Sequence, residues 1–380
     1  MRLVVYTDYV YRRSGEVVYG ERAFALFLAE LAGHSEQLTI VGRLAPQPGV
    51  SHYPLPPGVE FVGLPHYADL TRPLTVLGSL IRSLHRFWRV LRDVDRVWLL
   101  GPYPHAVAFA LLTLVRRRRL VLGVRQDFPA YVRSRRPGRR WAHRAADLLE
   151  LCWVTLARRC PVIVVGPELE RHYQHSPRVL SIAVSLISAE DVGAGEQASK
   201  RSYAGELRLL SVGRLDREKN PLLLADVLAR LRKQDARWRL LVCGDGPLAE
   251  DLVRRLSELG LSDDAELLGY VPIQAGLLDL YRSSHVFLHV SWTEGMPQVL
   301  MEAFASGVPV AATAVGGVAG AVGEAGLLIP PGDAAAAASA VHRIATETGL
   351  RLQLMRAGLQ RARDHTLETE AQRVADFIRA

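Results

Sequence analysis

The chain has 380 residues and a mass of 42.0 kDa, which is too long for one small module and suits two domains of roughly 150 to 200 residues each. Hydrophobic residues make up 49% and charged residues 23%, which excludes a disordered chain and a collagen-like repeat. Cys152, Cys160 and Cys243 fit neither a Cys-x-x-Cys pair nor a zinc spacing. We therefore expect a globular protein of a reducing cytoplasm.

The net charge of +8 is unevenly distributed along the chain. Residues 1–190 contain 26 Lys and Arg against 15 Asp and Glu, whereas residues 191–380 contain 21 against 24. A basic first half suits an anionic partner such as a membrane surface or a phosphorylated acceptor. We expect no nucleic-acid partner, because interleaved aromatic residues and a recognised binding module are missing. Alternatively, the 44 Arg among the 47 basic residues reflect codon bias and are simply solvated.

Short runs of Val, Leu and Ile alternate with longer helical patterns, which is typical of parallel βαβ units. In the first half we expect strands at residues 3–7, 38–42, 60–63, 97–100, 120–124, 162–165 and 179–182. We expect helices there near residues 17–32, 74–91, 106–115 and 139–157. In the second half we expect strands at residues 207–212, 239–243, 266–268, 286–290, 308–312 and 327–329.

The residues after Ser188 are polar and lack an apolar period, so we expect residues 188–205 to be a linker. It would join an N-terminal domain, 1–187, to a C-terminal domain, 206–360, and a last helix, 361–380, could pack back on the N-terminal domain. The fold class predicted is α/β, with two Rossmann-like, doubly wound domains facing each other across a cleft. In such sheets ligands bind outside the carboxyl ends of the strands.

Membrane association is left open by the sequence. The uncharged stretch 97–115 is interrupted by Gly101 and Pro102, so it is too short to cross a bilayer. Two helical segments, 74–91 and 139–159, combine Trp and Leu with many Arg, and each either packs on the core with a solvated Arg face or lies in a membrane interface. The stripe in the first comprises Leu74, Leu77, Ile81, Leu84, Trp88 and Leu91, and the second carries Trp141, Leu148, Leu149, Cys152 and Trp153.

A candidate anion site follows the strand at 207–212. Arg214 and Lys219 lie in the segment that leads to a helix beginning at Pro221. A helix N-terminus carries partial positive charge and unpaired N–H groups, so two neighbouring cations suit a phosphate or diphosphate. The alternative is a solvated charged turn at residues 216–219.

Two glutamates follow the strand at 286–290. Glu294 precedes the helix that Pro297 starts, and Glu302 lies inside this helix. Their eight-residue separation corresponds to about 12 Å along a helix, which exceeds the roughly 5 to 9.5 Å between paired glycosidase carboxylates. We therefore expect them to grip two parts of one polar ligand, for which the hydroxyl groups of two sugars are suited. His289 has no partner at helical spacing and is interpreted as structural or exposed.

These two stretches, read together, resemble a known family. The patterns G-R-L-x-x-x-K-N-P from Gly213 and E-G-M-P-x-V-x-M-E-A-x-A-S-G-x-P-V-x-A-T from Glu294 are similar to those of the retaining glycosyltransferases of family four, which have the GT-B fold. The resemblance covers residues 207–333. It implies that the first half binds an acceptor and the second half a nucleotide-diphosphate sugar. Arg214 and Lys219 would hold the departing diphosphate, Glu294 the donor sugar and Glu302 the ribose hydroxyls.

The resemblance also implies further binding positions. The loop at Gly244 and Gly246 would line the nucleotide side, and Tyr270 and Val271 would border the base. The other donor-binding positions implied are Gly213, Gly295, Met296, Gln298 and Val299. In the first half, a turn at Gly15 or Gly20 would approach the donor phosphates. The His that many relatives carry is absent from residues 122–127, so Asp127 is the candidate in its place, with Arg125 and Gln126 as alternatives.

The predicted function is transfer of a hexosyl group, with retention, from a nucleotide-diphosphate sugar to a sugar, glycan or lipid-linked acceptor. No metal or other cofactor is expected, because Asp93-Val94-Asp95 is interpreted as a solvated turn. We expect a cytoplasmic enzyme that could sit peripherally on the inner face of the membrane. The alternatives are an epimerase or phosphorylase on the same fold, or a catalytically silent sugar-nucleotide-binding subunit.

Overall fold

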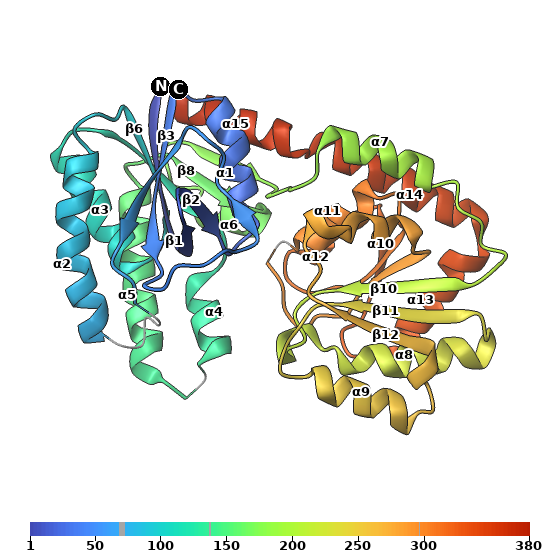
Figure 1. Ribbon diagram of the computed structural model, residues 1–380. Coiled ribbons are helices and arrows are strands. Elements are labelled where there is room, and N and C mark those ends of the chain that lie inside the picture. Colours follow the sequence, from blue (N-terminus) through green and yellow to red (C-terminus); the bar gives the residue numbers. More distant parts are fainter. Residues whose placement is uncertain (68–72, 137, 296) are drawn as a thin grey trace. The chain divides into compact units, whose positions relative to one another are not determined.

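The computed structural model describes residues 1–67, 73–136, 138–295 and 297–380 (Figure 1). The chain forms two compact units, of which the first contains Met1–Leu186 and Leu367–Ala380 and the second Ile187–Thr366. Each unit is built on its own mainly parallel sheet with helices packed on it. This confirms the predicted α/β class with two doubly wound domains.

The sheet of the first unit is centred on a long strand, β1, that pairs in parallel with β3 and β6. Its parallel strands in spatial order are β5 (Val59–Leu64), β3 (Gln37–Leu44), β1 (Arg2–Ser14), β6 (Arg96–Gly101), β7 (Arg119–Val124), β8 (Val162–Val165) and β9 (Val179–Ile182). The helices are α1 (Phe24–Gly33), α2 (Pro73–Val90), α3 (Pro104–Val115), α4 (Phe128–Arg135), α5 (Arg140–Ala157), α6 (Pro167–His172) and α15 (Leu367–Arg379). Phe87 of α2, Phe109 of α3 and Trp153 of α5 belong to one buried cluster with the strands, so these helices cover the same face of the sheet.

The start of the chain differs from the prediction. Strand β1 continues to Ser14 and returns through β2 (Val17–Gly20), which pairs with it antiparallel, and β4 (Tyr53–Pro54) pairs with β2. The turn between β1 and β2 contains Gly15 at φ +58°, a left-handed conformation that favours glycine. The predicted helix over 17–32 was therefore wrong at its start, where β-branched Val17 and Val18 extend the sheet instead.

The sheet of the second unit is parallel throughout. Its strands in spatial order are β12 (Ala265–Gly269), β11 (Trp238–Cys243), β10 (Leu207–Val212), β13 (Val286–His289), β14 (Val310–Thr313) and β15 (Gly326–Ile329). Every strand predicted in this half is present, with its ends shifted by at most two residues. The helices are α7 (Ala189–Ala198), α8 (Leu222–Gln234), α9 (Ala249–Glu258), α10 (Leu277–Ser283), α11 (Gln298–Ala305), α12 (Val318–Val322), α13 (Ala334–Thr346) and α14 (Thr348–Asp364), with short 3-10 turns at Arg217–Lys219, Ser262–Asp264 and Ile273–Ala275.

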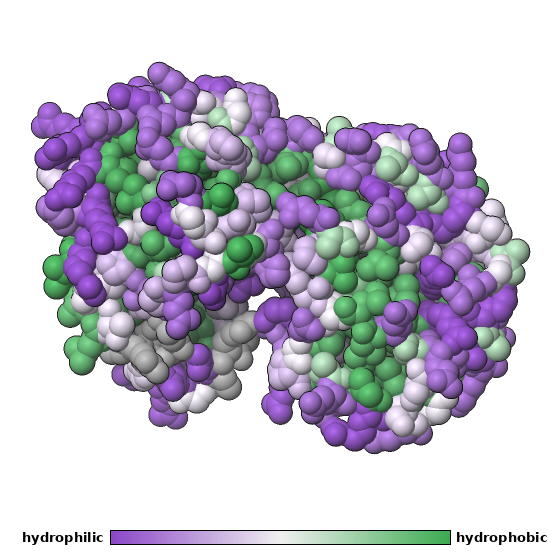
Figure 2. Space-filling model, viewed as in Figure 1, coloured by the Kyte–Doolittle hydropathy of each residue, from purple (hydrophilic) through white to green (hydrophobic). Residues whose placement is uncertain are grey.

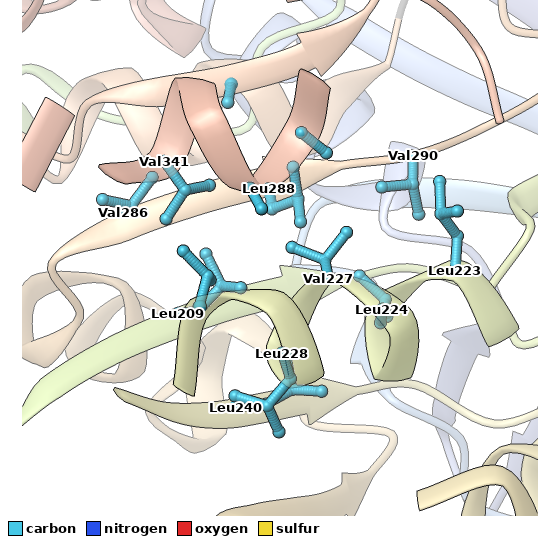
Figure 3. Close-up of a cluster of buried hydrophobic side chains, with 14 of the residues drawn as sticks. Leu209, Leu223, Leu224, Val227, Leu228, Leu240, Val286, Leu288, Val290 and Val341 are labelled. Atoms are coloured by element: carbon cyan, nitrogen blue, oxygen red, sulfur yellow. The ribbon is translucent and has the colours of Figure 1, made fainter. Parts of the chain in front are cut away.

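Two buried clusters lie on opposite faces of this sheet. One joins the strands to α8, α9 and α13; Figure 3 shows part of it, with Leu224, Val227 and Leu228 of α8 close to Leu209, Leu240 and Leu288 of the strands and to Val341 of α13. The other joins the strands to α10, α11, α12 and α14. Alternate strand residues supply the two clusters, as expected for a sheet that is buried on both faces. This packing fixes the strand ends, from which the loops of the candidate site emerge.

The segment predicted as a linker contains helix α7. Ser188 caps it, since Ser188 Oγ accepts from Asp191 N at 3.1 Å and Asp191 Oδ2 accepts from Ser188 N at 3.0 Å, a reciprocal capping box. Val192 and Gly195 are buried, and a Cβ on Gly195 would lie 1.8 Å from Ala305 O of α11. The side of α7 that packs on the unit consists of Val192 and Gly195. Because only one of them is a large apolar residue, the sequence shows no apolar period that would predict this helix.

The C-terminal segment forms two helices, α14 and α15, which belong to different units. In α15, Ala371, Val374 and Ile378 are buried, and Arg379 donates to His34 O at 2.6 Å. The two chain ends therefore lie close together in the first unit (Figure 1). Across the described residues, no helix combines the length and the apolar character needed to span a bilayer.

The two basic helices do not turn their whole apolar stripes inward. In α2, Leu74, Leu77 and Ile81 are exposed, whereas Ser79 and Ser83 are buried. In α5 the stripe is divided in the same way, because Trp153 is buried but Trp141 and Leu148 are exposed. Packing of these apolar stripes on the core was one of the two interpretations left open, and it is wrong for the exposed residues. The periodicity correctly predicted the helices but not their inward faces.

Candidate functional site

Three loops meet at the carboxyl end of the second unit's sheet. They follow β10, β13 and β14, which are neighbours in that order. Trp292 N, in the loop after β13, donates to Glu218 O at 2.8 Å in the loop after β10. Gly317 N, in the loop after β14, donates to Glu294 O at 3.3 Å. Backbone hydrogen bonds thus tie the middle loop to both neighbours, at the sheet edge where parallel sheets bind ligands.

Glycines permit the close approach of these loops. A Cβ on Gly316, which has φ +47°, would lie 2.0 Å from Glu294 O. In the loop after β11, a Cβ on Gly244 would lie 1.9 Å from Gly213 O, and one on Gly246 would lie 2.4 Å from Leu215 O. No side chain fits at such distances, so these glycines set the spacing between loops.

Glu294 lies at the centre of the three loops, with its side chain 12% exposed. Its Oε1 accepts from Lys219 Nζ and from Ser291 Oγ, the latter at 3.0 Å, and lies 3.1 Å from His289 Nε2. Burial alone would raise the pKa of Glu294, but the hydrogen bond with His289 and the charge of Lys219 outweigh it and lower the pKa to about 2. Glu294 is therefore an anion at neutral pH and acts as a hydrogen-bond acceptor.

The two predicted cations of the loop after β10 have different surroundings. Lys219 is paired with Glu294. Arg214, whose side chain is 44% exposed, pairs with Asp216 at 2.7 Å and with Glu218. The 3-10 turn Arg217–Lys219 ends at Asn220, which has φ +52°, and α8 follows. The sequence did not predict that each cation pairs with a carboxylate.

Glu302 has the opposite electrostatic character to Glu294. It is buried inside α11, where its Oε2 accepts from Tyr281 OH at 3.0 Å. Burial raises the pKa of Glu302 to about 7. At neutral pH the carboxyl group is thus divided between its protonated and charged forms, so it can donate or accept a hydrogen bond.

The loops after β11 and β12 lie beside the loop after β10. Gly244 N donates to Gly269 O at 2.7 Å, and Tyr270 N donates to Asp245 Oδ2 at 3.1 Å. The side chain of Tyr270 is exposed, whereas Val271 packs on the core. These contacts extend the candidate site along the sheet edge, and Asp245 is a site residue that the sequence analysis missed.

Most of the predicted donor-site residues lie at this one edge. Gly213 N donates to Cys243 O at 2.9 Å, Gly295 is exposed, and Gln298 and Val299 are half-buried in the first turn of α11. Met296 lies outside the described residues.

Gly15 and Asp127 belong to the first unit. Gly15 lies in the turn between β1 and β2, and Asp127 caps α4 by accepting from Ala130 N at 2.9 Å.

His289 and Ser291 were also missed. His289 is buried at the end of β13 and faces Glu294, so it is not exposed, and the contact with Glu294 was not predicted. Ser291 Oγ also lies 3.1 Å from His289 Nε2. The available signal was their position, because His289 ends the strand that precedes the Glu294 motif and Ser291 lies in the loop that follows it. Among the described residues, no group of three or more His, Cys, Asp or Glu side chains is arranged to hold a metal ion.

The fold and the candidate site define a class of protein: two doubly wound units, with glycine-spaced loops that carry Arg214 and Lys219 in the second, characterise GT-B glycosyltransferases. Residues 206–347 match the model of the family described as Glycosyl transferases group 1. The Anabaena protein HepE in complex with UDP aligns over 99% of both chains, with a TM-score of 0.70 and 18% identity. The match to the group 1 glycosyltransferases thus lies within the second unit, and the likeness to the solved structure shows the GT-B fold, as predicted.

Named relatives match over part of their length. The D-inositol 3-phosphate glycosyltransferase of Kribbella flavida is 34% identical over 223 residues, 54% of this chain and 52% of the relative. The corresponding protein of Corynebacterium urealyticum is 32% identical over 260 residues, 63% of this chain and 61% of the relative. The chain thus spans about half to three fifths of these relatives.

Proposed function

We propose that the protein transfers a hexosyl group from a nucleotide-diphosphate sugar to an acceptor, with retention of configuration. The observation that carries this proposal is the contact of Lys219 with Glu294 at the sheet edge. It places a cation beside a permanently charged acceptor, which together suit a phosphate next to a sugar hydroxyl. The match of residues 206–347 to the family model and the likeness to a UDP-bound structure support the same choice.

Arg214 and Lys219 bind the donor diphosphate in this proposal. Arg214 is the more exposed cation, and a guanidinium has five N–H donors, so it can reach phosphate oxygens while keeping a contact with Asp216. Lys219 exchanges part of its contact with Glu294 for a phosphate oxygen. Both cations then stabilise the negative charge that develops as the glycosidic bond breaks. No protein nucleophile is required.

Glu294 accepts a hydrogen bond from a hydroxyl group of the donor sugar, since its low pKa keeps it charged. Glu302 contacts the ribose hydroxyls, and the exposed ring of Tyr270, with Val271, borders the base. Gly244 and Gly246 keep the neighbouring loop close to this part of the site. Gln298 and Val299 supply backbone N–H groups from the first turn of α11.

The first unit binds the acceptor, which is a sugar, a glycan or a lipid-linked sugar. Asp127 offers a carboxylate between β7 and α4, at the carboxyl end of the first sheet. The basic charge of residues 1–190 supports contact with an anionic membrane surface on the cytoplasmic side. The protein acts there as a peripheral enzyme and needs no metal ion.

A thermal-shift panel tests the donor site. The ligands are the diphosphates of uridine, guanosine, adenosine and thymidine, and the proteins are wild type, Lys219→Ala and Arg214→Ala. Arg217→Ala is the matched control, because Arg217 is an exposed cation of the same loop. We expect one nucleotide to stabilise wild type and the control but neither site variant. Equal stabilisation of all four proteins would contradict the assignment.

Turnover then separates transfer from the alternatives. Release of nucleoside diphosphate that depends on an added acceptor indicates transfer. Interconversion of the donor sugar without acceptor indicates an epimerase, and nucleotide binding without turnover across an acceptor panel indicates a silent binding subunit. Either of the last two results would overturn the proposed activity while leaving the nucleotide site in place.

A further inference from the structure

Three helices on one face of the first unit expose several large apolar side chains while they bury several small ones. In α2, Leu74 is 83% and Ile81 is 65% exposed, and Leu77 between them is exposed as well. The same helix buries Ser79 and Ser83. Burial of serine in preference to leucine runs against the usual hydrophobic order, so the outer side of α2 carries apolar surface that packing within the unit leaves uncovered.

Helix α3 repeats this inversion. It exposes Leu111, Leu114 and Val115 and buries Ala106 and Ala110. It packs against both α2 and α5, so it lies between the other two helices.

Helix α5 is arranged in the same way. It exposes Leu148 and Leu151 and buries Ala142 and Ala146. All three helices direct an aromatic side chain into the same cluster beneath the sheet, so their outer sides face the same way. We call the exposed set the outer apolar face: Leu74, Leu77, Ile81, Leu111, Leu114, Val115, Trp141, Leu148 and Leu151.

Figure 2 shows hydrophobic residues at the edge of the molecule where Figure 1 places α2, next to strongly hydrophilic ones. Single exposed apolar residues are ordinary on protein surfaces, whereas a group of them gathered on neighbouring helices marks an interaction site.

Arginines border the outer apolar face, and its first two helices contain no acid. Residues 73–92 and 96–126, which include α2 and α3, have no Asp or Glu. Arg82, Arg86 and Arg89 project from α2 and are exposed. Four more arginines, 116–119, follow α3, and the Arg116 guanidinium lies 3.7 Å from the centre of the Trp88 ring. The occupant of this face must therefore combine apolar and anionic groups.

We propose that the outer apolar face docks on an anionic lipid bilayer, with α2 and α3 lying along the membrane plane. The leucines, the isoleucine and the valine enter the upper acyl region, and the arginines contact the phosphates of the headgroups. This deepens the proposed function, on which it rests, by assigning its membrane contact to named helices. A second copy of the chain is disfavoured as occupant, because a symmetric contact would bring the same arginines together.

Vesicle co-sedimentation without donor or acceptor tests the docking face. Vesicles contain phosphatidylcholine alone or with about 30% phosphatidylglycerol. Wild type should bind the anionic vesicles and show little affinity for the neutral ones. Leu77→Ser combined with Ile81→Ser should weaken binding at least tenfold, because each change removes a partitioning side chain. Arg82→Gln combined with Arg89→Gln should weaken it roughly tenfold or more, since each arginine near an anionic surface contributes about fivefold.

Matched controls come from the second unit. Leu352→Ser on α14 removes an exposed leucine, and Arg230→Gln on α8 removes an exposed arginine. Both should bind vesicles like wild type. Equal binding to neutral and anionic vesicles, or equal losses in the controls, would overturn the proposal. A lipid-independent dimer that Leu77→Ser and Ile81→Ser dissociate would also overturn it and would identify a second copy as the occupant.

The two proposals fail separately. Nucleotide-dependent thermal stabilisation of every variant shows that the second unit is folded and its site intact, whatever happens to vesicle binding. Circular dichroism with an unchanged melting transition shows that the first unit retains its helices. If wild type binds anionic vesicles but no nucleotide, the donor-site proposal is refuted and the proposed docking face is supported. If it binds nucleotide but no vesicle, the docking face falls.

Discussion

Lys219 and Glu294 are 75 positions apart in the chain and form an ion pair between the loops after β10 and β13. Because those strands are adjacent in the sheet, the parallel topology itself brings the two side chains together. A backbone hydrogen bond from Trp292 N to Glu218 O joins the same two loops. The contact therefore links the strand order of the second unit to the electrostatics of its candidate site.

Replacing Glu294 by Gln tests this link. The amide keeps the shape but removes the charge that faces Lys219, so we expect turnover to fall by about 100-fold or more. The free energy of unfolding should fall by about 1–3 kcal/mol, because Lys219, His289 and Ser291 lose a charged acceptor. Urea denaturation and initial rates measure the two effects. Glu250→Gln, on the surface of α9, is the control, and equal rates in both variants would refute the role of Glu294.

The two glutamates predict opposite pH effects on stability. The pKa of Glu302 is raised from 4.5 to about 7, so between these values the native state keeps a proton that the unfolded state releases. Stability from Glu302 is therefore lost as pH rises from about 4.5 to 7, by about 1.4 kcal/mol per pH unit at most. The pKa of Glu294 is lowered to about 2, so its contribution is present above pH 4.5 and is lost as pH falls towards 2.

Glu302→Gln isolates the first of these effects. The amide resembles the protonated acid, so the variant should match wild type near pH 5 and exceed it in stability near pH 8. Urea unfolding at both pH values gives the difference between the two proteins. Glu294→Gln should be less stable than wild type at both. A Glu302→Gln variant that is destabilised more at pH 8 than at pH 5 would show that the pKa of Glu302 is not raised.

The sequence predicted the second unit better than the first, for physical reasons. Its strands are short apolar runs that end at turn signals, and the motifs around Arg214 and Glu294 follow two of them. His289 and Ser291 were missed because their contacts with Glu294 form only in the folded protein. Spacing along the chain could not predict that Lys219 pairs with Glu294, because the pairing depends on strand order.

Other errors came from packing that hydrophobicity does not reveal. Periodicity predicted that Leu74, Leu77 and Ile81 share one side of a helix, but not that Ser79 and Ser83 would take the inward side. The extension of β1 into a hairpin depends on the turn at Gly15, which lies between charged residues and does not interrupt a clear apolar pattern. The sequence predicted that α2 is a helix and that β1 is a strand. Tertiary contacts decide which side of α2 faces the core and where β1 ends.

Gly316→Ala should damage the candidate site through the backbone. The added methyl group would lie 2.0 Å from Glu294 O and would also be strained at φ +47°, so we expect a loss of about 2–4 kcal/mol of unfolding free energy. Nucleotide-dependent stabilisation should weaken as well, because the loop that carries Glu294 must move. Gly205→Ala, in the second unit but outside the candidate site, is the control, since a Cβ there meets nothing within 4 Å. Similar stability of the two variants would show that the loops are not closely packed.

Gly193 and Gly195 of α7 form a matched pair for testing whether this helix is part of the second unit. A Cβ on Gly193 meets nothing within 4 Å, whereas one on Gly195 would lie 1.8 Å from Ala305 O. If α7 packs on α11, Gly193→Ala should stabilise the unit by about 1 kcal/mol through helix propensity. Gly195→Ala should destabilise it by about 2 kcal/mol or more, because the backbones must separate. Urea unfolding compares the variants, and stabilisation by both would mean that residues 189–198 form a helix detached from α11.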